Sequence, residues 1–201
     1  YMPEALAIKA GTDILFSEFL QTGLIYIQTA SSMIPAKVLG PDAEDHVLDM
    51  CAAPGSKTTH IAALMGNRGS IDAWDVYPHK VKLIKDNAKR LGISIIHTEV
   101  RDSVKPLPFL YETYDKVLLD APCSGLGVLG HKVELRWRRK ESDLSVFPPL
   151  QKQLIEQAAK YTKTGGVLVY STCTLNPDEN EHIINEFLSL HSEFALEEFN
   201  F

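Results

Sequence analysis

The stretch HVLDMCAAPGSKT at positions 46–58 decides the fold. It starts as a short aliphatic run typical of a buried strand, passes through small residues, and ends where a helical pattern begins at Ser56. A strand that leads through a Gly-containing loop into a helix lets backbone amides approach a bound ligand closely. The stretch therefore predicts the first strand–loop–helix unit of an α/β domain, with a ligand at its loop.

This loop differs from two familiar nucleotide-binding loops. A phosphate-binding P-loop needs Gly immediately before its Lys, whereas here Ser56 precedes Lys57. The spaced glycines of a dinucleotide-binding loop are missing as well. A loop of this width suits an adenosine ligand without a pyrophosphate.

The rest of the chain continues the alternation of strand and helix. Short aliphatic runs predict strands over 46–50, 70–75, 94–98, 114–120 and 166–171, and helical patterns cover 56–65, 77–91, 149–161 and 177–190. The last helix opens with Asp178 and Glu179, where the helix dipole favours acids. This alternation predicts a doubly wound, mostly parallel sheet with its ligand at the carboxyl ends of the strands.

Two flanks lie outside this pattern. Residues 1–40 are expected to form an N-terminal extension, with a hairpin over 16–27 and a helix over 31–39, before the main domain at 41–201. Residues 194–200 resemble one more strand, but no turn or partner strand follows. Because the chain also starts at Tyr1 rather than Met, we expect a fragment that is truncated at a C-terminal hairpin.

Composition narrows the class of protein. The 201 residues are 45% apolar and 23% charged, which is typical of one globular domain, and neither a membrane-spanning run nor a secretory signal is visible. Three cysteines without paired spacing predict no disulfide framework and no metal site, and favour a cytoplasmic location. The net charge is −6, so a nucleic-acid surface would have to be a local basic patch.

Several reactive residues follow predicted strands. Asp75 stands 20 residues after Gly55, where an acid typically accepts hydrogen bonds from ribose hydroxyls, and Asp102 follows the third strand. Capping of a turn is the alternative role for both acids. Cys123 and Cys173 follow the fourth and fifth strands, so we interpret them as reactive thiols rather than small buried side chains.

The motifs CAAPGSKT, DAPCSGLG, YSTCT and NPDENE, together with Asp75, resemble the RNA cytosine-5 methyltransferase family over about residues 22–190. Within it, GVLGHKVELRWRRK and LQKQLIEQAAKYTKTGGVLVYSTCT are most similar to the bacterial ribosomal RNA small subunit methyltransferase B group. The resemblance implies the catalytic domain of a Rossmann-like class I methyltransferase. It also implies S-adenosyl-L-methionine as methyl donor and cytosine in RNA, in particular 16S ribosomal RNA, as acceptor.

The resemblance assigns roles to individual residues. Cys173 would be the nucleophile that attacks C6 of cytosine, Cys123 would assist release of the product, and Asp120 would face both cofactor and base and act near N3 if it can be protonated. The cofactor-binding residues would be Cys51, Ala52, Ala53, Pro54, Gly55, Ser56 and Lys57 in the loop, Asp75 at the ribose, Asp102 near the adenine, and Asp120. The chain departs from the family at Ser56, where Gly is usual, and after Asp75, where a basic residue is more common.

A basic segment follows the Cys123 motif. Residues 131–140 hold Trp137 and five cations, which suit phosphate contacts and stacking on an unpaired base; the cations are Lys132, Arg136, Arg138, Arg139 and Lys140. A solvated loop is the alternative. Gln28, Ser31 and Ser32 match a family segment that lines the same cleft, although Thr29 replaces the usual acid there.

Two other functions stay open at this point. A DNA cytosine-5 methyltransferase would use Cys123 as its nucleophile and leave Cys173 a structural role. A methyltransferase-like module could bind RNA or a protein partner without catalysis. Measuring cofactor binding and then methyl transfer to ribosomal RNA would separate the enzyme from the module.

Overall fold

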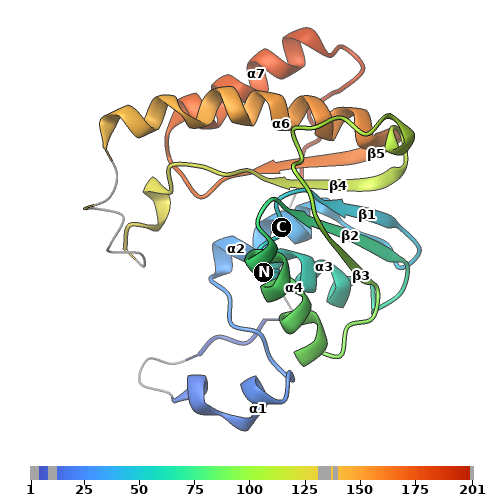
Figure 1. Cartoon of the computed structure of the whole chain (residues 1–201), viewed down its shortest axis with the longest axis vertical. Helices are drawn as coiled ribbons and strands as arrows, with labels where there is room; N and C mark the ends of the chain where they lie inside the picture. The colour runs from blue at the N-terminus through green and yellow to red at the C-terminus, as the bar shows by residue number, and fades with distance from the viewer. Residues whose placement is uncertain (1–4, 9–12, 131–136, 138–139, 200–201) are drawn as a thin grey trace.

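The computed structural model describes residues 5–8, 13–130, 137 and 140–199 (Figure 1). Its centre is one parallel sheet with the strand order β3-β2-β1-β4-β5. The strands are β1 (His46–Asp49), β2 (Ser70–Asp75), β3 (Ile96–Val100), β4 (Tyr114–Asp120) and β5 (Thr162–Ser171). The predicted parallel α/β sheet is confirmed, although β3 lies two residues later than expected and β5 begins four residues earlier.

Helices cover both faces of the sheet, as Figure 1 shows. Alternate strand residues point to opposite faces, so Val47 and Leu118 pack with the helices at 30–39 and 56–64, whereas Leu48 and Leu119 pack with the helices at 147–161 and 181–190. The helices are α2 (Ala30–Leu39), α3 (Ser56–Leu64), α4 (Pro78–Arg90), α6 (Phe147–Tyr161) and α7 (Glu181–Leu190). Within the described ranges, none of the helices has the length and apolar character needed to cross a bilayer.

The chain order reverses between β1 and β4, which lie side by side in the sheet. The loops after two such strands lead away from each other, and ligands of doubly wound folds bind in the crevice between them. The register also pairs Asp120 of β4 with Ser171 of β5. The cysteine motifs that follow these two strands therefore start from adjacent positions.

The prediction of a hairpin over residues 16–27 is wrong. That part of the chain forms a 3-10 turn (η1, Ile14–Phe16) and the short helix α1 (Glu18–Gln21), while the predicted helix is confirmed as α2. Arg90 Nη1 donates to the carbonyl oxygens of Leu20 (2.7 Å) and Ile25 (3.3 Å), and so replaces the hydrogen bonds that a second strand would have made. Gly23, with φ +80°, passes so close to Arg90 that a Cβ atom would lie 1.8 Å from its carbonyl oxygen.

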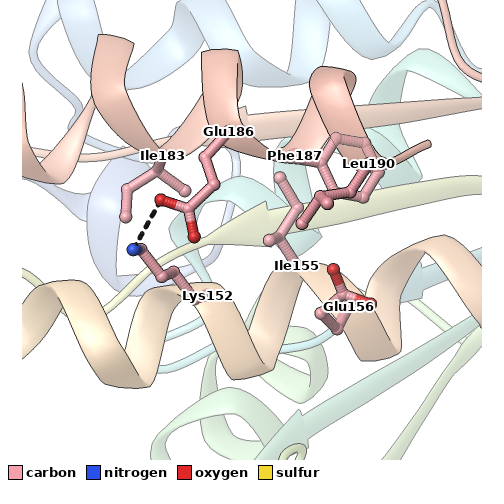
Figure 2. A pocket seen from close by; sticks show the side chains of 7 residues that line it. All are labelled: Lys152, Ile155, Glu156, Ile183, Glu186, Phe187 and Leu190. Atoms are coloured by element: carbon pink, nitrogen blue, oxygen red, sulfur yellow. Dashed lines mark hydrogen bonds and ion pairs between the residues drawn. The ribbon is translucent and has the colours of Figure 1, made fainter. Parts of the chain in front are cut away.

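The C-terminal prediction also needs correction. Residues 194–199, the described part of the expected strand, form no strand, and the Phe194 ring instead packs 5.2 Å from that of Phe187. The helix predicted over 177–190 divides into a 3-10 turn (η5, Pro177–Glu179) and α7. Figure 2 shows the crevice between α6 and α7, where Lys152 Nζ reaches Glu186 Oε2 at 2.6 Å above an apolar floor.

Candidate active site

A small cavity that opens to solvent lies where β1 and β4 end. Gly55 precedes α3 with φ +100°, and a Cβ atom there would lie 3.2 Å from Ile84 Cα, so the loop needs glycine at this position. No side chain caps the N-terminus of α3, which begins at the cavity. The lining combines loop residues with two carboxylates: Asp49, Cys51, Ala52, Ala53, Pro54, Ser56, Lys57 and Asp120.

Asp49 is a site residue that the sequence analysis missed. It is 1% exposed, and its Oδ2 accepts a hydrogen bond of 2.7 Å from Thr58 Oγ1, whereas its Oδ1 has no hydrogen-bond partner in the described part of the chain. Burial raises the pKa of Asp49 to about 7, with the Thr58 hydrogen bond acting in the opposite direction. A buried acceptor beside a cavity is suited to a donor group of a ligand.

Lys57 and Asp120 connect the cavity to the cysteine motifs. Lys57 Nζ donates to Asp120 Oδ2 at 2.6 Å, and Ser171 Oγ donates to Asp120 Oδ1 at 2.8 Å. Both carboxylate oxygens are therefore acceptors in this arrangement. Ser171, at the end of β5, is a second contact that the sequence analysis did not single out.

Asp75 and Asp102 lie further along the same edge, outside the cavity lining. Asp75 is 7% exposed, and its Oδ1 accepts a hydrogen bond from the Tyr77 amide at 3.0 Å. Asp102 is more exposed, accepts from the Val104 amide at 3.3 Å and lies 3.6 Å from Lys105 Nζ. The contacts of Asp102 are those of a turn-capping residue.

The structure brings the two predicted thiols together. Cys123 Sγ lies 3.0 Å from Cys173 Sγ and accepts a hydrogen bond of 3.2 Å from the Cys173 amide. The hydrogen bond with Cys173, followed by burial, raises the pKa of Cys123, whereas Cys173 is the exposed member of the pair. This shift favours the protonated form of Cys123, and Cys173 is the thiol more open to a large substrate.

Cys51 differs from this pair. Burial raises the pKa of its thiol, and the carboxylates of Asp49, Asp75 and Asp120 raise it further. A thiol that stays protonated is a poor nucleophile. Cys51 therefore serves as a small lining residue of the cavity.

The predicted RNA segment lies mostly outside the described residues. Lys132, Arg136, Arg138 and Arg139 belong to that undescribed part, while Trp137 is 88% exposed and Lys140 is exposed. In the N-terminal segment, Gln28 Nε2 donates to the Ser56 carbonyl oxygen at 3.1 Å and so reaches the cavity loop. Ser31 and Ser32 contact Thr29, the N-cap of α2.

No group of three or more described His, Cys, Asp or Glu side chains is arranged to hold a metal ion.

Comparisons with known proteins identify relatives of this chain. The probable ribosomal RNA small subunit methyltransferase B of Bacillus subtilis is 43% identical over 192 residues, which are 95% of this chain and 43% of that protein. The tRNA (cytosine(72)-C(5))-methyltransferase NSUN6 of Mus musculus is 43% identical over 169 residues, which cover 78% of this chain and 35% of that protein. The chain thus spans less than half the length of these curated relatives.

A solved structure of NSun6 from Pyrococcus horikoshii with SFG superimposes with a TM-score of 0.82 at 38% identity, covering 89% of this chain and 46% of that one. A family model described as 16S rRNA methyltransferase RsmB/F matches residues 36–201. Since this match begins inside α2 and runs through every strand of the sheet, the chain belongs to the RsmB/F family of 16S rRNA methyltransferases.

Proposed function

We propose that this chain carries the methyl-transfer chemistry of an RNA cytosine-5 methyltransferase, with S-adenosyl-L-methionine as donor and cytosine in 16S ribosomal RNA as acceptor. The observation that carries the proposal is the pair of thiols 3.0 Å apart on the strand ends next to the cavity. The names of the relatives, which refer to ribosomal RNA and to cytosine C5 of tRNA, support the substrate class.

The residues around the cavity fit S-adenosylmethionine. Asp49 Oδ1 would accept from the methionine ammonium, and the uncapped N-terminus of α3 would bind the carboxylate. Asp75 would accept from the ribose hydroxyls and Asp102 would lie near the adenine, while residues 51–57 form the supporting loop. SFG, present in the Pyrococcus NSun6 structure, is an analogue of this donor and supports the assignment.

When bound, S-adenosylmethionine supplies an electrophilic methyl group, and C5 of cytosine is too weak a nucleophile to accept it unaided. Cys173 Sγ bonds to C6, and the electron pair of the C5–C6 double bond makes C5 nucleophilic. Once C5 carries the methyl group, a base removes the C5 proton. The C5–C6 double bond then re-forms as the bond from Sγ to C6 breaks.

The two thiols divide this work. Either sulfur of the pair can donate the hydrogen bond between them; with the proton on Cys123, its S–H would stabilise a thiolate at Cys173 for attack. The same proton lies within reach when Cys173 has to leave as a thiol. The geometry therefore supports Cys173 as the nucleophile and Cys123 as the residue that assists release.

Asp120 acts together with Lys57. The Asp120 oxygens already accept from Lys57 and Ser171, and they can also accept from the cytosine N4 amino group. The Lys57 ammonium, 2.6 Å from Asp120, is the proton donor available to this pair. We assign the hydrogen bond near N3 to the pair rather than to Asp120 alone.

The test uses single cysteine variants with cytosine-containing ribosomal RNA and S-adenosylmethionine carrying a labelled methyl group. Cys173→Ala should transfer no methyl group, whereas Cys123→Ala should accumulate a labelled protein–RNA complex that survives denaturing electrophoresis. Cys51→Ala serves as the control thiol and should form no such complex. Trapping by Cys173→Ala instead would make Cys123 the nucleophile, as in DNA cytosine-5 methyltransferases, and equal activity of all three would refute the thiol mechanism.

A further inference from the structure

We propose that Glu179 is a positioning residue that holds the two cysteine loops at their working separation; the proposal rests on the thiol chemistry proposed above. The sequence predicts Glu179 as one of two acids at a helix N-terminus, where the helix dipole favours a negative charge. In the structure it lies in the first turn of the 3-10 helix η5 as an acid with a further set of contacts, since it is 0% exposed and its carboxylate accepts from groups inside the fold.

The carboxylate of Glu179 accepts hydrogen bonds from three elements. Its Oε2 accepts from the Ser124 amide at 2.8 Å and from Gln151 Nε2 at 3.1 Å. Its Oε1 accepts from Asn176 Nδ2 at 3.2 Å. One side chain thereby joins the loop after β4, the helix α6 and the loop after β5.

These partners stand next to the thiols. Ser124 directly follows Cys123, and Asn176 lies three residues after Cys173. Gln151 Nε2 also donates to the Pro122 carbonyl oxygen at 2.9 Å, so the Cys123 loop is held on both sides of its thiol. A displacement of the Glu179 carboxylate would therefore move one thiol relative to the other.

The contacts of the Glu179 carboxylate are those of a group that fixes the position of its neighbours. Within the described residues, no Lys, Arg or His forms an ion pair with Glu179, and its three donors are neutral. A buried carboxylate without an opposite charge is costly in desolvation, so an acid suits this position only because three donors meet there and bind it. Two fixed oxygens that bind three donors define the relative position of two loops.

Further hydrogen bonds join the same loops, so removal of the charge should loosen the thiol pair without separating it. Ser124 Oγ lies 2.7 Å from Thr174 Oγ1, and the Gly127 amide donates to the Cys173 carbonyl oxygen at 3.0 Å. A misplacement of about 1 Å can lower a rate about a hundred-fold when two groups must meet in one geometry. The rate at which the two thiols form a disulfide depends on their separation, so this rate reports such a misplacement.

The first measurement is the rate at which diamide cross-links Cys123 to Cys173. The two thiols are oxidised to one disulfide while the diazene takes up both hydrogens and becomes a hydrazine, and non-reducing peptide mapping separates this pair from products of Cys51. Glu179→Gln places an amide nitrogen against a donor, so cross-linking should slow at least about ten-fold. The matched control Glu186→Gln removes an α7 carboxylate whose ion pair, among the residues that the structure describes, is with Lys152 alone, and it should cross-link at the wild-type rate.

A double variant separates positioning from damage to the fold. Asn176→Asp alone sets two carboxylates 3.2 Å apart and should also slow cross-linking. Combined with Glu179→Gln, it restores one donor and one acceptor at this contact, and the cross-linking rate should return to within about three-fold of wild type. If Glu179→Gln fails to fold, the double variant carries the test by itself, because a folded double variant that cross-links slowly contradicts the proposal.

Methyl transfer gives the second measurement. Glu179→Gln should lower kcat about ten- to a hundred-fold while the affinity for S-adenosylmethionine, measured by calorimetry, stays at the wild-type value. An unchanged cross-linking rate in Glu179→Gln, or wild-type thiols that do not cross-link, would overturn the proposal. If the wild-type chain transfers no methyl group, the proposed function fails, but the cross-linking rates still decide the role of Glu179.

Discussion

Asp49 should make the stability of this protein depend on pH, and Asp49→Asn should remove that dependence. Burial raises the pKa of the carboxyl from 3.8 to about 7, so the folded protein binds this proton more tightly than the unfolded chain does. Its contribution to stability is fully present below about pH 4 and is lost as the pH rises to about 7. The difference between the two pKa values corresponds to about 4 kcal/mol, and the group is fully buried, so solvent screening reduces it little.

An asparagine at this position still accepts the hydrogen bond from Thr58 but cannot ionise. Between pH 5 and pH 8, the unfolding free energy of Asp49→Asn should rise relative to wild type by about 3 kcal/mol. Urea unfolding of both proteins at the two pH values measures this change. Asp86→Asn, on the exposed side of α4, is the control and should follow the wild-type curve.

The same substitution should weaken binding of S-adenosylmethionine at pH 8 by roughly 1 to 3 kcal/mol, because the ammonium loses a carboxylate partner. Asp49 would then be a residue that lowers stability at neutral pH in exchange for ligand affinity. A difference in unfolding free energy that stays constant within about 0.5 kcal/mol across the pH range would refute the reasoning about burial.

Three other substitutions test separate parts of the structure. Asp75→Ala should lower the affinity for S-adenosylmethionine by roughly 1 to 3 kcal/mol, and unchanged affinity in calorimetry would contradict a ribose contact. Gly23→Ala should destabilise the packing of the N-terminal segment against α4 by about 2 kcal/mol or more, because the added Cβ would meet the Arg90 carbonyl oxygen. Limited proteolysis of this variant should then cut first within residues 13–28. A cleavage pattern like that of the wild type would contradict this packing. Replacing Arg136, Arg138 and Arg139 with Gln should reduce the slope of log affinity against log salt for RNA by about 2, whereas an unchanged slope would assign the segment to a solvated loop.

The sheet could be predicted because its central strands carry short aliphatic cores. In the run 114–120, Val117, Leu118 and Leu119 are aliphatic and fully buried, so local pattern and tertiary position agree there. The segment 16–27 has a similar alternation around Gly23, but there the glycine permits close approach to α4 rather than a hairpin turn. Nothing within the segment distinguishes these uses, because the deciding partner, Arg90, is distant in sequence.

The candidate site, too, could be predicted from the sequence only in part. Residues at strand ends, such as Asp120, Cys123 and Cys173, could be placed together because parallel strands bring their carboxyl ends to one edge. Glu179 could not, since an acid in the first turn of a helix is usually exposed. Its burial depends on donors from Ser124 and Gln151, whose arrival at this point is a property of the packed fold.

The position of α2 has a consequence for synthesis on the ribosome. Ala36 and Leu39 of this helix are buried in the same core as Leu118 of β4 and Val169 of β5. Translation proceeds from the N-terminus, so the apolar side of α2 is only partly covered, by α3 and β1, until β4 and β5 have been made. The domain therefore cannot complete its folding stepwise as it emerges, and interruption of synthesis before β5 would leave a nascent chain in which the apolar side of α2 is a target for chaperones and for aggregation.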